Sequence, residues 1–338
     1  MTTDASSEAE EYVRALFNAL LYRDPRADEL REWTMRIRDG MAEREVFSRF
    51  VSSEEYRSAH RVVSAFPDGH YYSPIVDPDE LMVAKQPNRK VGPKDIAGID
   101  LSLDRMIDWW QRNASTLRAT PFPDAESPAH RYYADNNMYP LGDAAVLRAM
   151  ILAQRPERII EIGSGFSSAC MLDTVDEAGL ETELTFIEPE ADRLRSLLRP
   201  SDTERVRVVE ARVQEIPLDE FRALGEGDVL FIDSSHVLKT GSDVHRELFE
   251  ILPALASGVL IHFHDIDYPF EYPDLFLFER RYSWNEAYAV RAFLMYNANY
   301  RVEFMTAMFR RMAAGLVRTT FPPFDEQPGA SLWLRKVG

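Results

Sequence analysis

Ionisable side chains follow two apolar runs that have the character of buried strands. Asp233 ends the first run, His236 stands three residues beyond it, and His264 and Asp265 end the next run. The carboxyl ends of parallel strands meet at one edge of a sheet, so we expect these side chains to converge on one pocket. Asp233, His264 and Asp265 offer two carboxylates and one imidazole, a set that suits Mg²⁺ or a transition metal. The same groups could instead bind one another and orient a substrate.

A glycine turn stands at the end of an earlier apolar run. Gly163 and Gly165 lie where a turn between a first strand and its helix lets a ligand approach the backbone. A dinucleotide-binding fingerprint needs a third glycine, but the chain continues Phe166-Ser167-Ser168, which disfavours a Rossmann oxidoreductase. Glu188 ends the next predicted strand, where a carboxylate can accept hydrogen bonds from both hydroxyls of a ribose. The pattern predicts a cofactor that contains a nucleoside.

The elements that position these residues alternate between helix and strand. This alternation predicts an α/β fold, a Rossmann-like, doubly wound sheet of seven strands, mostly parallel, with helices on both faces. The expected strands are 158–162, 184–188, 206–210, 228–233, 259–264, 300–306 and 331–336. The expected helices are 141–154, 167–178, 190–199, 217–223, 242–255 and 285–297. Unbroken apolar runs suit strands that are buried on both faces.

The start of the chain predicts a separate all-α domain. Apolar residues recur with helical spacing from Glu8 to about Val63, which predicts about four helices. The Arg23-Asp-Pro-Arg26 break, Asp39-Gly40 and Ser52-Ser-Glu-Glu55 mark helix ends. These helices could mediate formation of a homodimer.

Prolines and a lack of periodic apolar positions mark residues 65–100 as a linker or an arm on the catalytic domain. The prolines are Pro67, Pro74, Pro78, Pro87 and Pro93. A helix is expected after them at 102–117. The expected domains are a helical bundle at 1–64, the arm with its helix at 65–130 and the catalytic domain at 131–338.

The composition is that of a globular protein with a strong acidic balance. The chain has 338 residues, of which 45% are hydrophobic and 28% charged, enough to bury a sizeable core. Its formal net charge of −17 disfavours binding to nucleic acid or to anionic membranes. No apolar stretch approaches the roughly 20 residues of a membrane span, and the N-terminus is acidic, so we expect a cytoplasmic protein. The single cysteine, Cys170, is expected to be a small buried hydrophobe.

The run from Glu161 to Ser168, Glu-Ile-Gly-Ser-Gly-Phe-Ser-Ser, resembles the first motif of the class I S-adenosylmethionine-dependent methyltransferases. The resemblance implies that Glu161 holds the ammonium group of the cofactor and that Ser164 and Ser168 belong to the same binding site. It also implies that Gln214, after the third strand, contacts the adenine ring. Asp233 would border the same cofactor.

The ends of strands four and five resemble those of the metal-dependent O-methyltransferases of the catechol and macrolide-sugar kinds. In these families one Asp ends strand four, an acidic pair ends strand five, and a base lies three residues after the first Asp. His236 has this spacing, and an imidazole that titrates near neutral pH suits deprotonation of a hydroxyl. His264 stands where these families have an acid. Lys239 is the second candidate for the base, because desolvation lowers the pKa of a lysine.

Three longer segments look like a bacterial methyltransferase family with few assigned substrates, namely 231–244, 262–273 and 284–288. By this resemblance residues 265–271 form a loop over the pocket. Its candidates for a lid or a substrate wall are Tyr268, Phe270 and Tyr272. Segment 17–33 resembles a short helical domain of unknown function.

We therefore expect an enzyme that transfers a methyl group from S-adenosylmethionine to a hydroxyl of a small or secondary metabolite, with His236 as general base. Methylation of a nitrogen or of a carboxylate stays open. The rival classes are a Rossmann oxidoreductase and a non-catalytic binding protein. A divalent metal is a possible second cofactor, and the sequence does not identify the acceptor.

Overall fold

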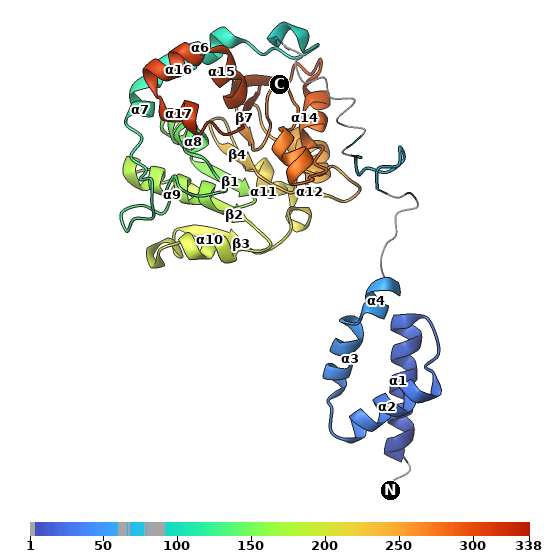
Figure 1. The fold of residues 1–338 in the computed structure, drawn as a ribbon. Coiled ribbons are helices and arrows are strands. Elements are labelled where there is room, and N and C mark those ends of the chain that lie inside the picture. The colour runs from blue at the N-terminus through green and yellow to red at the C-terminus, as the bar shows by residue number, and fades with distance from the viewer. Residues whose placement is uncertain (1–3, 60–65, 67, 78, 80–91) are drawn as a thin grey trace. The chain divides into compact units, whose positions relative to one another are not determined.

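The computed structural model describes residues 4–59, 66, 68–77, 79 and 92–338, which belong to two compact units (Figure 1). The units are Met1–Ile75 and Val76–Gly338, whereas the sequence places the end of the first domain at residue 64. Three prolines of the expected linker, Pro67, Pro78 and Pro87, lie outside the described residues. None of the helices in the described part is long and apolar enough to cross a membrane.

The described residues of the first unit form a bundle of four helices, as the helical spacing predicts. The helices are α1 (Asp4–Leu21), α2 (Ala27–Arg38), α3 (Glu43–Val51) and α4 (Glu54–Ala59). Their small core consists of Val13, Leu16, Phe17, Leu21, Val46 and Phe50. Gly40 follows α2 with a φ of +99°, a left-handed conformation that glycine adopts without strain. The last residues of the expected bundle, 60–63, are not among the described ones, and dimer formation through this unit stays a prediction.

The second unit is built on one sheet of seven strands in the order β3-β2-β1-β4-β5-β7-β6. The strands are β1 (Arg158–Ile162), β2 (Glu183–Ile187), β3 (Val206–Val209), β4 (Val229–Ile232), β5 (Leu260–Phe263), β6 (Tyr300–Met305) and β7 (Leu332–Lys336). The first five strands pair in parallel, and β7 is antiparallel to both β5 and β6. The predicted Rossmann-like, mostly parallel sheet is therefore confirmed. Strands β4 and β5 are buried throughout, which explains their apolar runs.

Helices precede the sheet, connect its parallel strands and follow β6 (Figure 1). The described α-helices of this unit are α6 (Leu103–Arg112), α7 (Ala114–Arg118), α8 (Leu141–Gln154), α9 (Phe166–Ala178), α10 (Asp192–Leu197), α11 (Leu218–Arg222), α12 (Asp243–Arg246), α13 (Leu252–Ala254), α14 (Glu286–Leu294), α15 (Thr306–Met312), α16 (Ala314–Thr320) and α17 (Pro323–Glu326). Shorter 3₁₀ or π turns are η1 (Pro93–Asp95), η2 (Pro200–Asp202), η3 (Val213–Glu215), η4 (Glu247–Ile251) and η5 (Leu275–Glu279). The helix expected at 102–117 is interrupted at Asn113, and α15 to α17 were not predicted.

The strand order reverses between β1 and β4. The strands β2 and β3 lie on one side of this point, and β5 lies on the other. In an open parallel sheet, ligands bind in the crevice beyond the carboxyl ends of the strands at such a switch point. The segments that follow β1, β2, β4 and β5 carry Gly163, Glu188, Asp233 and His264, so the fold brings the sequence-predicted residues to this crevice.

A buried ionic cluster anchors the segment before α8 to helix α9. Arg131, whose side chain is 2% exposed, pairs with Asp173 and Asp176 at 2.8 and 2.9 Å and with Asp202 at 2.5 Å. The backbone N–H groups of Arg131 and Tyr132 also donate to Asp173. Removal of the guanidinium would leave buried carboxylates without their counter-charge. The loss of one partner from a buried ion pair strongly destabilises a protein.

We expect Arg131→Leu to lower the free energy of unfolding by about 3–5 kcal/mol. The matched control is Arg205→Leu, which removes a partly exposed pair with Asp176 and should cost about 1 kcal/mol or less. Urea denaturation of both variants measures the difference. Equal effects in the two variants would contradict an anchoring role for the buried cluster.

Candidate active site

Two adjoining cavities meet at the switch point of the sheet. The smaller cavity, of about 500 Å³, is lined by the segments that follow β2, β3 and β4. The larger cavity, of about 840 Å³, is lined by the segment before α8, the glycine turn and the segments after β4 and β5. Both are bordered by Gly163, Glu188, Asp233, Ser234 and Ser235. Volumes of this size suit small-molecule ligands, and the common wall joins the cavities into one site.

Gly163 is fixed by the close approach of the backbone that follows β4. Its φ is +80°, and a Cβ at this position would stand 1.7 Å from the carbonyl oxygen of Asp233. The N–H of Asp233 donates to the carbonyl of Ile162 at 2.8 Å, which holds the two segments together. Gly165 differs, because a Cβ there would lie 3.4 Å from the side chain of Arg193, an ordinary contact. The turn therefore requires glycine at 163 but has room for a methyl group at 165.

Gly163→Ala is expected to destabilise the protein by about 2–5 kcal/mol, because it combines a left-handed backbone with a clash against main-chain atoms. Gly165→Ala serves as the matched variant and should change the free energy of unfolding by less than about 1 kcal/mol. Thermal or urea denaturation distinguishes them. A stable Gly163→Ala protein would show that the β1 and β4 segments can separate.

Glu161 lies behind the glycine turn and lines neither cavity. Its carboxyl group is fully buried, and the hydroxyls of Ser167 and Ser168 donate to its two oxygens. Ser168 also accepts the N–H of Gly165 at 2.9 Å. Burial raises the pKa of Glu161 to about 8, although the hydroxyl contacts act in the opposite direction. Glu161 and Ser168 thus support the turn from beneath, and their contact with the cofactor stays a prediction.

Glu188 and Gln214 line the smaller cavity. The carboxylate of Glu188 accepts the backbone N–H groups of Ser164 and Glu190 at 3.1 and 2.8 Å. A carboxylate offers about four acceptor positions, so about two remain for a ligand. Gln214 donates through Nε2 to the carbonyl of Gly241 at 3.0 Å, which fixes its side chain at the cavity wall.

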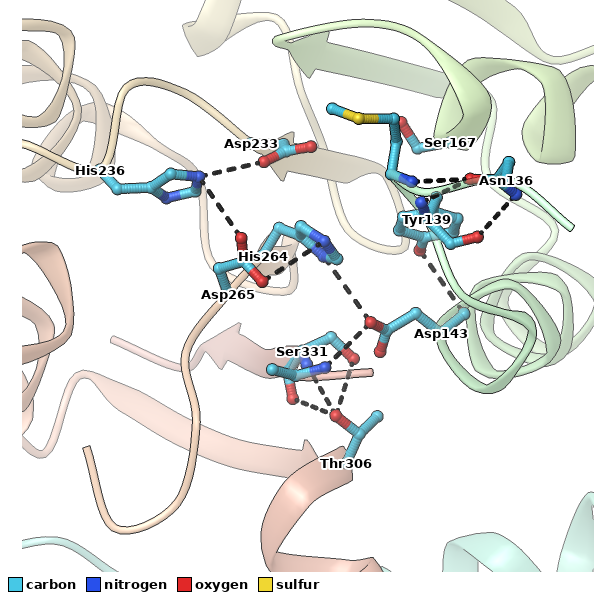
Figure 2. A network of polar contacts seen from close by, with 12 residues as sticks. Asn136, Tyr139, Asp143, Ser167, Asp233, His236, His264, Asp265, Thr306 and Ser331 are labelled. Carbon is cyan, nitrogen blue, oxygen red and sulfur yellow. Dashed lines mark hydrogen bonds and ion pairs between the residues drawn. The ribbon is translucent and has the colours of Figure 1, made fainter. Parts of the chain in front are cut away.

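His236 is oriented by a carboxylate from a distant part of the sequence. Its Nδ1 lies 2.8 Å from Oε2 of Glu286, the first residue of α14. Its carbonyl accepts the N–H groups of Asn285 and Glu286, which helps to hold its left-handed φ of +60°. His236 lines the larger cavity, and its Nε2 atom lies 3.4 Å from Asp233 and 3.8 Å from Asp265 (Figure 2).

Neighbouring carboxylates control the protonation of His236. Burial acts to lower its pKa, but hydrogen bonds and charges of Asp233 and Glu286 raise it well above its usual value. For Asp233, burial raises the pKa, but the imidazoles of His264 and His236 lower it below its usual value overall. The resting site therefore favours an imidazolium at His236 paired with carboxylates.

His264 belongs to a second group of acids and imidazole. Its Nδ1 lies 3.8 Å from Asp143 of α8, and its Nε2 lies 3.8 Å from Asp265. Burial raises the pKa of Asp143 to about 6. Figure 2 shows the resulting chain of side chains, which runs from Asp143 through His264 and Asp265 to His236.

The expected metal ligands Asp233, His264 and Asp265 do not surround one position. Across the described residues, no group of three His, Cys, Asp or Glu side chains could hold a metal ion. The Nε2 atom of His236 lies within 4 Å of both Asp233 and Asp265, so an imidazole stands between these carboxylates. In this structure the acids and histidines contact one another, and a metal at this site is not confirmed.

The aromatic residues expected to form a lid are part of the core. Tyr268, Phe270 and Tyr272 are at most 7% exposed and do not line either cavity. The aromatic residues after β5 that line the larger cavity are Phe276, Tyr282 and Trp284, which follow the expected loop.

Two residues of the site, Glu286 and Asp143, were not assigned a role from the sequence. Glu286 lies 50 positions after His236, so no local spacing reports their contact. Asp143 stands in the first turn of α8, where an acid is unremarkable as a helix-terminal charge. Lys239 lines the smaller cavity only, whereas His236 lines the larger one.

Comparison with known protein families identifies two domains. Residues 160–266 match a methyltransferase domain, and residues 2–59 match a domain of unknown function (DUF4214). The methyltransferase match begins within β1 and ends just after β5. It therefore contains the glycine turn, Glu188, His236 and the His264–Asp265 pair.

Similar proteins occur in archaea, bacteria and fungi. An uncharacterized protein of Archaeoglobus fulgidus is 32% identical over 169 residues, which are 48% of this chain and 74% of the archaeal protein. The SAH-bound methyltransferase PaMTH1 of Podospora anserina is 16% identical, with 82% of this chain and 100% of that chain covered and a TM-score of 0.38. The O-methyltransferase TomG of Streptomyces achromogenes is 14% identical, with 73% and 94% covered and a TM-score of 0.38.

The family assignment follows from the sequence matches together with the position of the site. The methyltransferase match spans the strands whose ends build both cavities, and the chain covers most of its archaeal relative. The glycine turn lacks the third glycine of a dinucleotide site. The chain belongs to the class I S-adenosylmethionine-dependent methyltransferases.

Proposed function

We propose that this methyltransferase acts on a hydroxyl group of a small molecule and that His236 is its general base. The observation that carries the proposal is the contact between Nδ1 of His236 and Glu286, in a histidine that lines the larger cavity. A carboxylate on Nδ1 selects the tautomer whose Nε2 can accept a proton. A hydroxyl must lose its proton when it is methylated, whereas a carboxylate acceptor is already ionised at neutral pH. A histidine base that is oriented by Glu286 therefore favours a hydroxyl over a carboxylate as the methyl acceptor.

The smaller cavity supports the nucleoside part of the methyl donor. The acceptor positions left on Glu188 suit the two ribose hydroxyls, and the fixed side chain of Gln214 suits an edge of the adenine ring. When bound, S-adenosylmethionine supplies an electrophilic methyl group on a sulfonium. Gly163 and Asp233 border both cavities, so we assign this common wall to the region where donor and acceptor meet. Ser164 lies beside them in the larger cavity, and Glu161 holds the turn from behind.

The larger cavity supports alignment and deprotonation of the acceptor. Methyl transfer is an in-line displacement, so the protein contributes mainly by positioning the acceptor oxygen and excluding water. His236 takes the hydroxyl proton at Nε2, and Glu286 and Asp233 stabilise the imidazolium that forms. Because the resting His236 is readily protonated, it has to release a proton before each turnover.

No step of this proposal passes through a metal, because the donor set does not fit one. We expect kcat to be unchanged after exhaustive treatment with EDTA. The control is the same treatment followed by dialysis against Mg²⁺ or Mn²⁺, which should add no activity. Loss of turnover on chelation, with recovery on addition of one of these ions, would contradict the metal-free site.

The acceptor class is tested with methyl-labelled S-adenosylmethionine and four simple probes. Phenol and a methyl glycoside offer hydroxyls, aniline offers a nitrogen, and phenylacetate offers a carboxylate. We expect methyl ethers, identified by NMR and mass spectrometry, with at least one hydroxyl probe. Methylation confined to aniline or phenylacetate, or of none of the probes, would contradict the proposed function.

A further inference from the structure

Part of the larger cavity is lined by aromatic residues that contact one another. Phe276, Tyr282 and Trp284 all line it and are half-buried. The rings of Tyr282 and Trp284 are stacked, with centroids 4.4 Å apart, and Phe276 meets Trp284 edge to face at 5.2 Å. The Trp284 ring also lies 4.2 Å from the imidazole of His236. A planar ligand ring can therefore contact this wall while one of its substituents reaches the base.

Arg280 stands at the same wall and forms no ion pair with any residue that the structure describes. Arg280 lines the cavity, and its guanidinium lies over the rings of Phe276 and Tyr282, 5.4 and 5.9 Å from their centroids. Within the described residues it forms no ion pair, although the chain has 56 acidic against 39 basic residues. An exposed guanidinium that is held against aromatic faces keeps its hydrogen-bond donors for a ligand.

The charged residues of the cavity fall into two groups. Four carboxylates, those of Asp143, Glu188, Asp233 and Asp265, line it together with His236, His264 and Arg193, whereas the guanidinium of Arg280 lies over two rings of the aromatic wall. An anionic group on a ligand would be repelled by the carboxylates and attracted by the guanidinium. Each cation of the first group has carboxylates beside it, whereas Arg280 has aromatic rings beside it, so an anionic group is placed best at Arg280 when the hydroxyl of the same ligand lies at His236.

We infer that the acceptor is a planar phenol that carries a carboxylate or a similar anionic group at the end away from its reacting hydroxyl. The inference rests on the proposed function, because it takes His236 as the base. In the reaction the phenol O–H bond breaks and its proton passes to Nε2 of His236. The phenol oxygen forms the new bond to the methyl carbon as the carbon–sulfur bond of the donor breaks, which leaves a neutral thioether.

The experiment compares 3-(4-hydroxyphenyl)propanoate with its uncharged amide as methyl acceptors. With the wild-type protein we expect the KM for the acid to be about tenfold lower than the KM for the amide. A tenfold difference in affinity corresponds to the contribution of one charge-assisted hydrogen bond at a partly exposed site. Arg280→Gln should raise the KM for the acid about tenfold and leave the KM for the amide unchanged. The kcat values for both acceptors should stay the same. Arg280→Lys should recover part of the affinity for the acid.

Arg281→Gln is the matched control, since this neighbouring arginine does not line the cavity. It should leave both KM values unchanged. Binding of the acid and the amide, measured by calorimetry with S-adenosylhomocysteine present, provides a readout that does not depend on turnover. Equal KM values for the acid and the amide, or an equal rise of both KM values in Arg280→Gln, would overturn the inference. Neither result would contradict O-methylation itself. Failure of the proposed function would instead appear as methylation of nitrogen or carboxylate probes only, and it would overturn this inference as well.

Discussion

His236→Ala is expected to lower kcat by about 10²–10⁴-fold, the usual contribution of a positioned general base. Affinity for S-adenosylmethionine should change little, because His236 does not line the smaller cavity to which we assign the nucleoside. The variant loses the proton acceptor that faces the reacting hydroxyl, but Asp233 and the glycine turn stay in place. Initial rates with a methylated hydroxyl probe, together with calorimetry of donor binding, measure the two effects separately.

Two variants serve as comparisons for His236→Ala. His245 on α12 contacts Phe249 and lines neither cavity, so His245→Ala should keep the wild-type rate. Lys239→Ala tests the second candidate for the base, and a loss of turnover there with full activity in His236→Ala would transfer the role to Lys239. Unchanged kcat in His236→Ala would remove His236 from the mechanism.

Glu286→Gln is expected to lower kcat by about 10²–10³-fold with a smaller effect on donor affinity. The amide keeps the shape of the side chain but no longer selects the tautomer of His236 or stabilises its imidazolium. Glu271→Gln is the matched control. Glu271 accepts a hydrogen bond from Tyr288, which lies on α14 as Glu286 does, but Glu271 does not contact His236. Equal rates for Glu286→Gln and wild type would show that this carboxylate does not orient the base.

The pH profile of Glu286→Gln provides a second readout. Burial lowers the pKa of His236, but Asp233 and Glu286 together raise it well above its usual value. Because the base must be neutral, kcat of the wild type should rise with pH through this raised pKa. Loss of the Glu286 charge lowers the pKa, so the rise should move to lower pH. A shift to higher pH would contradict the assigned contact.

The sheet could be predicted from the sequence because its strands have a simple signal. The β4 run Val229–Ile232 is apolar throughout and buried on both faces, and its place in an alternating series fixes a parallel sheet. Helices α15 and α16 have seven residues each and α17 has four, too few turns for a helical period to stand out. Their positions depend on packing within the folded unit.

The sequence predicts only those positions in the candidate site that directly follow the ends of the strands. Asp233 and His264 follow neighbouring strands, so their convergence follows from the sheet alone. The contact between His236 and Glu286 depends on how the segment after β5 returns to the site, which no spacing encodes. The sequence places Glu161 directly before the glycines, but it does not report that the buried carboxyl group accepts the hydroxyls of Ser167 and Ser168.

The sequence suggested a metal through the types of residues at the strand ends, but it does not report where their side chains point. Two carboxylates and an imidazole at adjacent strand ends suit a metal, but here His236 stands within 4 Å of both Asp233 and Asp265. The left-handed backbone of His236 and Asp265 contributes to this arrangement, with φ values of +60° and +53°. Such conformations are uncommon outside glycine and cannot be inferred from a residue pattern.

The most direct test of the central claim is a crystal structure of the protein with S-adenosylhomocysteine. We expect the adenosine to occupy the smaller cavity, with its ribose hydroxyls bound to Glu188 and its adenine beside Gln214. The thioether sulfur should lie at the common wall near Gly163 and Asp233, facing Nε2 of His236. An adenosine in the larger cavity, or a sulfur directed away from His236, would contradict the proposed site.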